Sequence, residues 1–165
     1  MLIKINSDFD NNKDSEKLSY LINNTIKTAS GALGITKENL IYEISILITT
    51  SSNIKELNQK YRKRSLVTNV LSFPQKLKVK GESIKKSKKE IVILGDIVLC
   101  VEKIKDEAES YSKSFSDHFS HLILHGFLHL LGFDHVKHID SVEMEKKEIE
   151  ILSKLNIKNP YILSN

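Results

Sequence analysis

The chain has 165 residues, of which 40% are hydrophobic and 28% charged, so its length and composition suit one globular domain with a substantial core. No apolar run approaches the ~18 residues of a membrane helix, and no basic stretch followed by an apolar run marks a secretory signal, so we expect no membrane partner. The net charge of +4 is compatible with an RNA partner but does not identify one.

Apolar patterns predict alternating strands and helices in the first third of the chain. Residues 2–7, LIKINS, read as a strand. Residues 14–30 place apolar side chains at helical spacing, and Gly31 is the expected cap of that helix. Residues 41–50, IYEISILITT, alternate apolar and polar side chains and predict a second strand.

The middle of the chain combines a short helix, a strand and a lysine-rich segment. Asn53 and Glu56 form a capping pattern for the helix, and residues 70–74, VLSFP, predict a strand that ends at proline. Residues 75–90 hold seven lysines and two glutamates, which predict a loop insert within the single domain of residues 1–165. This loop is either a solvated surface segment or an RNA-binding arm with the candidate contacts Lys85, Lys86, Lys88 and Lys89.

The second half begins with the most apolar strand, residues 91–100, which we expect to be central. Its lone cysteine, Cys100, cannot form an internal disulfide, so we expect a buried thiol in a cytoplasmic protein. A charged helix over 101–111 follows, and residues 115–131 are apolar nearly all round, which predicts a buried helix. Gly132 is placed to end it, and a last helix is expected from about 140 to 155. Together these elements predict an α+β sandwich of sheet and helices.

All six histidines fall between residues 118 and 138. His125 and His129 are four apart on the predicted helix, so both imidazoles leave the same face, as two ligands of one metal do. Gly132 lets the chain reverse, and His135 can then return to the same ion. Three imidazoles leave a fourth position open, which is typical of a catalytic zinc site, so we expect one zinc ion per chain.

Two side chains near the predicted ligands, His121 and Asp134, each have two possible roles. His121 lies one helical turn earlier and either competes as a ligand or supports the site from beside it. Asp134 either accepts a hydrogen bond from a ligand imidazole or caps the turn before it. His118 and His138 are expected at the surface.

The spacing H-x-x-x-H-x-x-G-x-x-H matches that of metzincin proteases except at one position. Gly126 stands where those proteases keep the glutamate that acts as general base, which disfavours peptide hydrolysis. Because glycine within a helix costs about 1 kcal/mol relative to alanine, we expect close approach there by a strand or by a substrate.

Four segments resemble the YbeY family of bacterial endoribonucleases. HGFLHLLGFDH, residues 125–135, is similar to its H-G-x-L-H-L-x-G-x-D-H signature. LNQKYRKRSLVTNVLSFP (57–74), LGDIVLC (94–100) and MEKKEIEIL (144–152) resemble further family motifs in the same order. The chain departs from the family at SLV (65–67), where an acidic residue and a proline are usual, and in its longer lysine-rich insert.

The resemblance implies a small cytoplasmic α+β domain with a four-stranded mixed sheet, about five helices and a metal site at the end of a buried helix. It implies zinc ligation by His125, His129 and His135, with Arg62 as the essential catalytic arginine beside the metal. The implied activity is single-strand-specific endonucleolytic cleavage in rRNA maturation, at the 3′ end of small-subunit rRNA, and in late ribosome quality control. The partners would be rRNA precursors and the small ribosomal subunit, with no DNA. The alternatives are a non-catalytic ribosome-assembly factor with structural zinc and, further off, a metalloprotease.

Overall fold

The computed structural model describes residues 1–9, 13–35, 40–80, 90–134 and 138–162. The elements are, in chain order, β1 (Leu2–Ser7), α1 (Lys13–Ala32), β2 (Leu40–Thr49), α2 (Ser51–Arg62), β3 (Val70–Lys80), β4 (Glu90–Cys100), α3 (Val101–Ser110), α4 (Phe115–Leu131) and α5 (His138–Ser153). Four of the described segments form one sheet in the order β1-β2-β4-β3, with only β3 antiparallel to its neighbour. The predicted α+β fold with a four-stranded mixed sheet and five helices is therefore confirmed.

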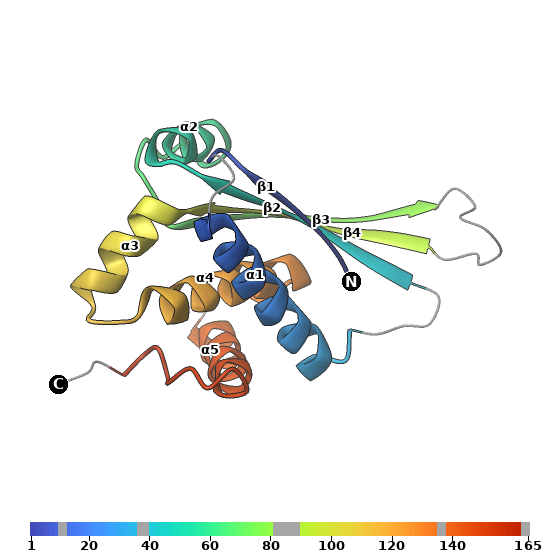
Figure 1. The fold of residues 1–165 in the computed structure, drawn as a ribbon. Coiled ribbons are helices and arrows are strands. Elements are labelled where there is room, and N and C mark those ends of the chain that lie inside the picture. Colours follow the sequence, from blue (N-terminus) through green and yellow to red (C-terminus); the bar gives the residue numbers. More distant parts are fainter. Residues whose placement is uncertain (10–12, 36–39, 81–89, 135–137, 163–165) are drawn as a thin grey trace.

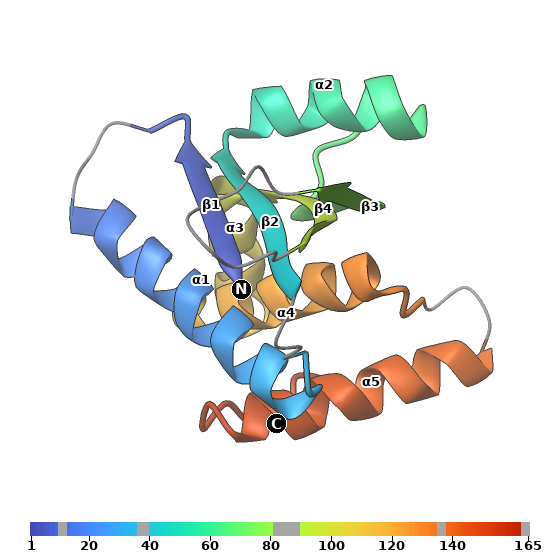
Figure 2. The ribbon, with the colours of Figure 1, turned by 90° about the vertical axis from the view of Figure 1, so that its right-hand side faces the viewer.

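Different helices cover the two faces of the sheet (Figures 1 and 2). Successive side chains of a strand point to opposite faces, so Ile97 and Leu99 join the main core with α1 and α4, whereas Val98 and Cys100 meet Ile54 of α2. The views show α2 alone over one face, and α1 and α4 beneath the other with α5 below them. Cys100 is fully buried in an interior strand, as predicted.

Helix α4 lies between the sheet and α5, which explains why its sequence is apolar nearly all round (Figure 2). The Ser114 side chain caps its start by accepting a hydrogen bond from the Asp117 backbone N–H at 3.0 Å. Gly132 ends the helix with a left-handed φ of 97°, as predicted. Fixed caps and packing on several sides make this helix a rigid base for the histidines.

Two predicted helix boundaries were wrong because local capping patterns are ambiguous. Helix α1 continues through Gly31 to Ala32, so Gly31 does not cap it. Helix α2 is capped by Thr50, whose side chain accepts a hydrogen bond from the Asn53 backbone N–H, rather than by Asn53 itself.

The predicted strand end at Pro74 was also wrong. Strand β3 continues to Lys80, and its register with β4 shifts between Pro74 and Leu77. Proline lacks a backbone N–H, but β3 is the edge strand, and an irregularity in the ladder accommodates the missing donor. The strands therefore occupy both ends of the predicted 75–90 loop, and its central lysines lie outside the described residues.

Candidate metal centre

His125 and His129 project from one face of α4 and direct the same ring nitrogen toward a common point. Their Nε2 atoms lie 3.1 Å apart, and the ring planes are inclined by 83° with centroids 4.6 Å apart. Two nitrogens that bind one tetrahedral zinc at about 2.0–2.1 Å lie about 3.3–3.4 Å apart. The spacing of this pair is therefore close to that of two ligands of one ion.

The opposite nitrogen of each ring is fixed by an acceptor. His129 Nδ1 lies 3.0 Å from the Phe133 carbonyl oxygen, and His125 Nδ1 lies 2.8 Å from Glu148 Oε1. Carbonyl and carboxylate oxygens only accept, so both Nδ1 atoms carry a proton, and each ring in its neutral form keeps a lone pair on Nε2. Two lone pairs at 3.1 Å repel unless a cation or a proton lies between them. The donor set thus fits a divalent metal that binds imidazole.

Glu148 of α5 links the histidines of α4 from beneath. It is fully buried, and its carboxylate accepts hydrogen bonds from His125, from His121 Nε2 at 3.3 Å and from the Tyr161 hydroxyl. Burial by itself raises the pKa of this carboxyl, but hydrogen bonds and charge interactions with His121 and His125 outweigh burial and hold the pKa at about 2. Burial and the adjacent carboxylate raise the pKa of the Tyr161 phenol, so Tyr161 stays protonated and donates.

Sequence reasoning missed Glu148, although a signal was present. Met144, Glu148, Ile151 and Leu152 recur at the spacing of one helix face, and the three apolar members are buried in the main core. An acidic residue in an apolar stripe is buried only when it is paired. The place of Glu148 in the apolar stripe therefore indicates a carboxylate that pairs with a buried cation or histidine.

The other two histidines of α4, His121 and His118, bind to different acidic residues. His121 contacts Glu148, and its ring lies edge-on to Tyr161 at 5.7 Å. His118 was expected at the surface, and that expectation was wrong: the side chain is buried and its Nε2 lies 3.0 Å from Glu107 of α3. Burial lowers the pKa of His118 despite the opposing effect of Glu107, because the charged ring loses its hydration.

The third predicted ligand, His135, lies outside the described residues. Within the described ranges, no group of three histidine, cysteine or acidic side chains is arranged to hold a metal. Asp134 is exposed and lines a shallow depression with Asp140 and Glu143 at the end of α4. The described part of the centre is therefore the pair of imidazoles with the groups that orient them.

Arg62 lies near the β3 edge of the sheet, toward which the histidine helix also runs. It is the last residue of α2, and its Nη2 donates a hydrogen bond to the Ser72 carbonyl oxygen of β3 at 3.1 Å. Ser72 in turn packs against α4 at Gly126, the residue that follows His125. The C-terminal ends of α2 and α4 reach the β3 side of the sheet from opposite faces (Figure 2).

Gly126 is required by the approach of the sheet. A Cβ at this position would lie 3.1 Å from both Ser72 Oγ and Ile97 Cγ2, closer than ordinary van der Waals contact. Of the two explanations open from the sequence, the structure supports a strand rather than a substrate. Any side chain at position 126 would therefore begin in close contact with the sheet.

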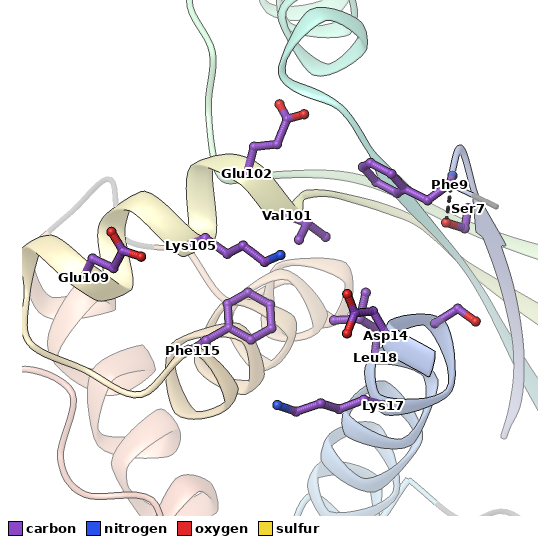
Figure 3. Close-up of a pocket in the computed structure, with 11 residues that line it drawn as sticks. Ser7, Phe9, Asp14, Lys17, Leu18, Val101, Glu102, Lys105, Glu109 and Phe115 are labelled. Carbon is purple, nitrogen blue, oxygen red and sulfur yellow. Dashed lines mark hydrogen bonds between the residues drawn. The ribbon is translucent and has the colours of Figure 1, made fainter. Parts of the chain in front are cut away.

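A pocket of about 420 Å³ lies elsewhere, between the start of α1, α3 and the start of α4 (Figure 3). Lys17, Lys105, Glu109 and Phe115 are among its lining residues, and none of the predicted site residues is.

Among the described residues, no helix combines the length and apolarity that crossing a bilayer requires.

The chain resembles known proteins over most of its length. The family model described as endoribonuclease YbeY matches residues 4–156. An endoribonuclease YbeY of Bartonella bacilliformis is 40% identical over 162 residues, which cover 97% of this chain and 98% of that protein. Its counterpart in Bartonella henselae is 41% identical over 150 residues, covering 90% and 89%.

A solved structure shares the fold. The solution structure of TM1509 from Thermotoga maritima matches with a TM-score of 0.57 and 24% identity, covering 93% of this chain and 89% of that chain. At this identity the likeness supports the fold alone. The sequence matches extend over nearly the whole chain and include the histidine helix, and on that basis the chain belongs to the endoribonuclease YbeY family.

Proposed function

We propose that this protein is a zinc-dependent, single-strand-specific endoribonuclease of the cytoplasm. Its substrates would be rRNA precursors, at the 3′ end of small-subunit rRNA, and it would act with the small ribosomal subunit in late quality control, not on DNA. His125, His129 and His135 would hold one zinc ion per chain. The observation that carries the proposal is the 3.1 Å distance between the Nε2 atoms of His125 and His129. Both rings are held in this orientation by hydrogen bonds at Nδ1.

The proposed cleavage reaction gives separate roles to the metal, to the groups that orient its ligands and to Arg62. Bound zinc supplies a Lewis acid and can lower the pKa of water to about 7. The Phe133 carbonyl and the Glu148 carboxylate orient His129 and His125, which keeps both lone pairs on the metal side. Arg62 is the proposed catalytic residue, because a guanidinium forks onto phosphate oxygens and stabilises the charge that develops during phosphodiester cleavage.

The geometry disfavours the alternatives. A metalloprotease needs a base beside the metal, and position 126 faces the sheet. A purely structural zinc site is closed on all sides, whereas His125 and His129 are both partly exposed. A partly exposed metal site, with Arg62 at the same edge of the sheet as a proposed phosphate-binding residue, would favour catalysis.

Three further assignments belong to this proposal. His121 supports His125 through their shared contact with Glu148, and Asp134 is a proposed hydrogen-bond partner of a ligand imidazole. The lysine-rich segment of residues 75–90 would attract phosphates as an RNA-binding arm. Its proposed contacts are Lys85, Lys86, Lys88 and Lys89.

The test is cleavage of a purified precursor rRNA by the metal-loaded protein, with chelator and with zinc added back. Arg62→Ala should keep its zinc, measured by mass spectrometry, and lose about 100-fold or more of the cleavage rate, as when one transition-state donor is removed. Arg62→Lys should recover only part of the rate, since it keeps the charge but not the fork. The control is Lys55→Ala, an exposed cation of the same helix.

Full cleavage by Arg62→Ala, or cleavage that ignores the chelator, would contradict the mechanism. A wild-type protein that binds zinc and precursor rRNA without cutting would instead support the assembly-factor alternative.

A further inference from the structure

The C-terminal end of α2 and the loop after it present an exposed apolar surface. Tyr61 is 57% exposed, Leu66 69% and Val67 37%. We call these three residues together with Arg64 the α2 platform. Three exposed apolar side chains fall within seven residues of the chain here, so the α2 platform is a candidate binding surface.

The α2 platform stands on an ordered backbone. The buried Asn58 side chain donates a hydrogen bond to the Leu66 carbonyl oxygen at 2.8 Å, and the Arg64 backbone N–H donates to the Asn58 carbonyl at 3.3 Å. The Tyr61 ring rests edge-on against Phe73 of β3, with centroids 5.2 Å apart. The tyrosine is therefore supported by Phe73 and remains 57% exposed, with Lys60 Nζ 5.2 Å from the centroid of its ring.

The charge around the α2 platform is positive. Arg62 and Arg64 are the only two arginines of a chain that otherwise uses lysine, and Lys60 and Lys63 lie between and beside them in sequence. None of the ion pairs formed by described residues includes any of these four cations. Arginine differs from lysine in its planar fork for phosphate and in its ability to stack on bases, which explains its use here.

The α2 platform lies toward the same edge of the sheet as the C-terminal end of α4, on the opposite face (Figure 2). Arg62, which is bonded to Ser72 on the edge strand, lies next to Tyr61 in the chain, and Ser72 packs on α4 beside His125. A strand that placed one phosphate at Arg62 would bring its neighbouring nucleotide to Tyr61.

We propose that the α2 platform binds an unpaired stretch of RNA next to the scissile phosphate, with a base stacked on Tyr61 and a phosphate held by Arg64. Only a single-stranded nucleic acid offers phosphates and open base faces together, because a duplex buries the faces in its stack. This proposal rests on the proposed function and deepens it, since it gives the structural origin of a preference for single strands.

The test measures binding of a fluorescein-labelled, 2′-O-methylated single strand to the metal-loaded full chain, with probe integrity checked on a gel. Tyr61→Ala should weaken binding about fivefold or more, the effect of losing one base–aromatic stack, whereas Tyr61→Phe should bind like the wild type. The matched control is Tyr20→Ala, which removes a tyrosine that is 67% exposed on α1, against the other face of the sheet.

A second variant guards against a folding defect at Tyr61. Leu66→Asp changes a side chain that is 69% exposed, so the fold should persist by circular dichroism while the introduced charge repels RNA. Arg64→Gln should lower the slope of log affinity against log salt by about 0.7, the value for one phosphate on a single strand, whereas Tyr61→Ala should leave the slope unchanged.

Equal affinities of the Tyr61→Ala and Tyr20→Ala proteins would overturn the α2 platform, as would equal losses on a single strand and on a duplex of the same sequence. These outcomes leave the proposed function standing if the wild type still cuts precursor rRNA in a chelator-sensitive way. Conversely, Tyr61-dependent binding by a protein that never cuts RNA supports the α2 platform and refutes the nuclease.

Discussion

Glu148→Gln keeps the shape of a fully buried side chain and removes its charge. The carboxylate accepts from His125 Nδ1 at 2.8 Å on one oxygen and from His121 and Tyr161 on the other. Glutamine has a single acceptor oxygen, so its NH₂ group must face a donor on one of the two sides. If the NH₂ group faces His125, that ring loses the acceptor that fixes its tautomer. If it faces the other way, His121 and the Tyr161 hydroxyl meet a donor in place of their acceptor.

The magnitude follows from the pKa. A shift from 4.5 to about 2 favours the charged form of Glu148 by about 3 kcal/mol, at 1.36 kcal/mol per pKa unit. Because the pKa is lowered on folding, this stabilisation is complete above pH 4.5 and is lost as the pH falls toward 2. Glu148→Gln should therefore be less stable by about 3 kcal/mol at neutral pH and lack this acid-dependent loss. Its zinc affinity should fall about 10–100-fold, as when other carboxylate partners of ligand histidines are removed.

The assay for stability is urea unfolding of the chelator-treated protein from pH 7 into the acid transition. The assay for zinc is competition with a chromophoric chelator. Glu150→Gln is the control, because Glu150 lies on the same helix but is exposed and pairs only with lysines among its resolved ion pairs. Wild-type stability and wild-type zinc affinity in Glu148→Gln would refute the role of this carboxylate in orienting His125.

Three other changes test separate parts of the structure. Gly126→Glu should create no activity on casein and should lower the free energy of unfolding by about 1–3 kcal/mol or more, because its side chain enters a packed contact with β3 and β4; calorimetry and a protease assay check both. Tyr161→Phe removes one of the hydrogen bonds to Glu148 and should weaken zinc binding less than Glu148→Gln does in the same competition assay. Neutralising the lysine-rich arm should flatten the salt dependence of RNA binding and leave cleavage at saturating RNA unchanged, and parallel slopes would return the segment to a solvated loop. The arm variant carries Gln at Lys85, Lys86, Lys88 and Lys89.

The sequence alone determined the features that depend on local backbone geometry. Helix α4 occupies the predicted residues 115–131, because its apolar pattern lies within the segment and its two caps, Ser114 and Gly132, lie next to it in the chain. The common direction of His125 and His129 follows from a spacing of four residues on any helix. Gly132 adopts the expected left-handed conformation for the same local reason. Arg62, in contrast, was indicated only by the family resemblance, since an exposed residue at a helix end has no local signal.

Only the tertiary structure decided which groups meet across elements. Glu148 reaches His125 from 23 residues away, and Gly126 is glycine because Ile97 and Ser72 of two different strands press on it. Strand β3 passes Pro74 because its partner β4 supplies the ladder on one side only. Such contacts depend on how helices and strands pack after they form, and no periodicity within one segment specifies a partner on another.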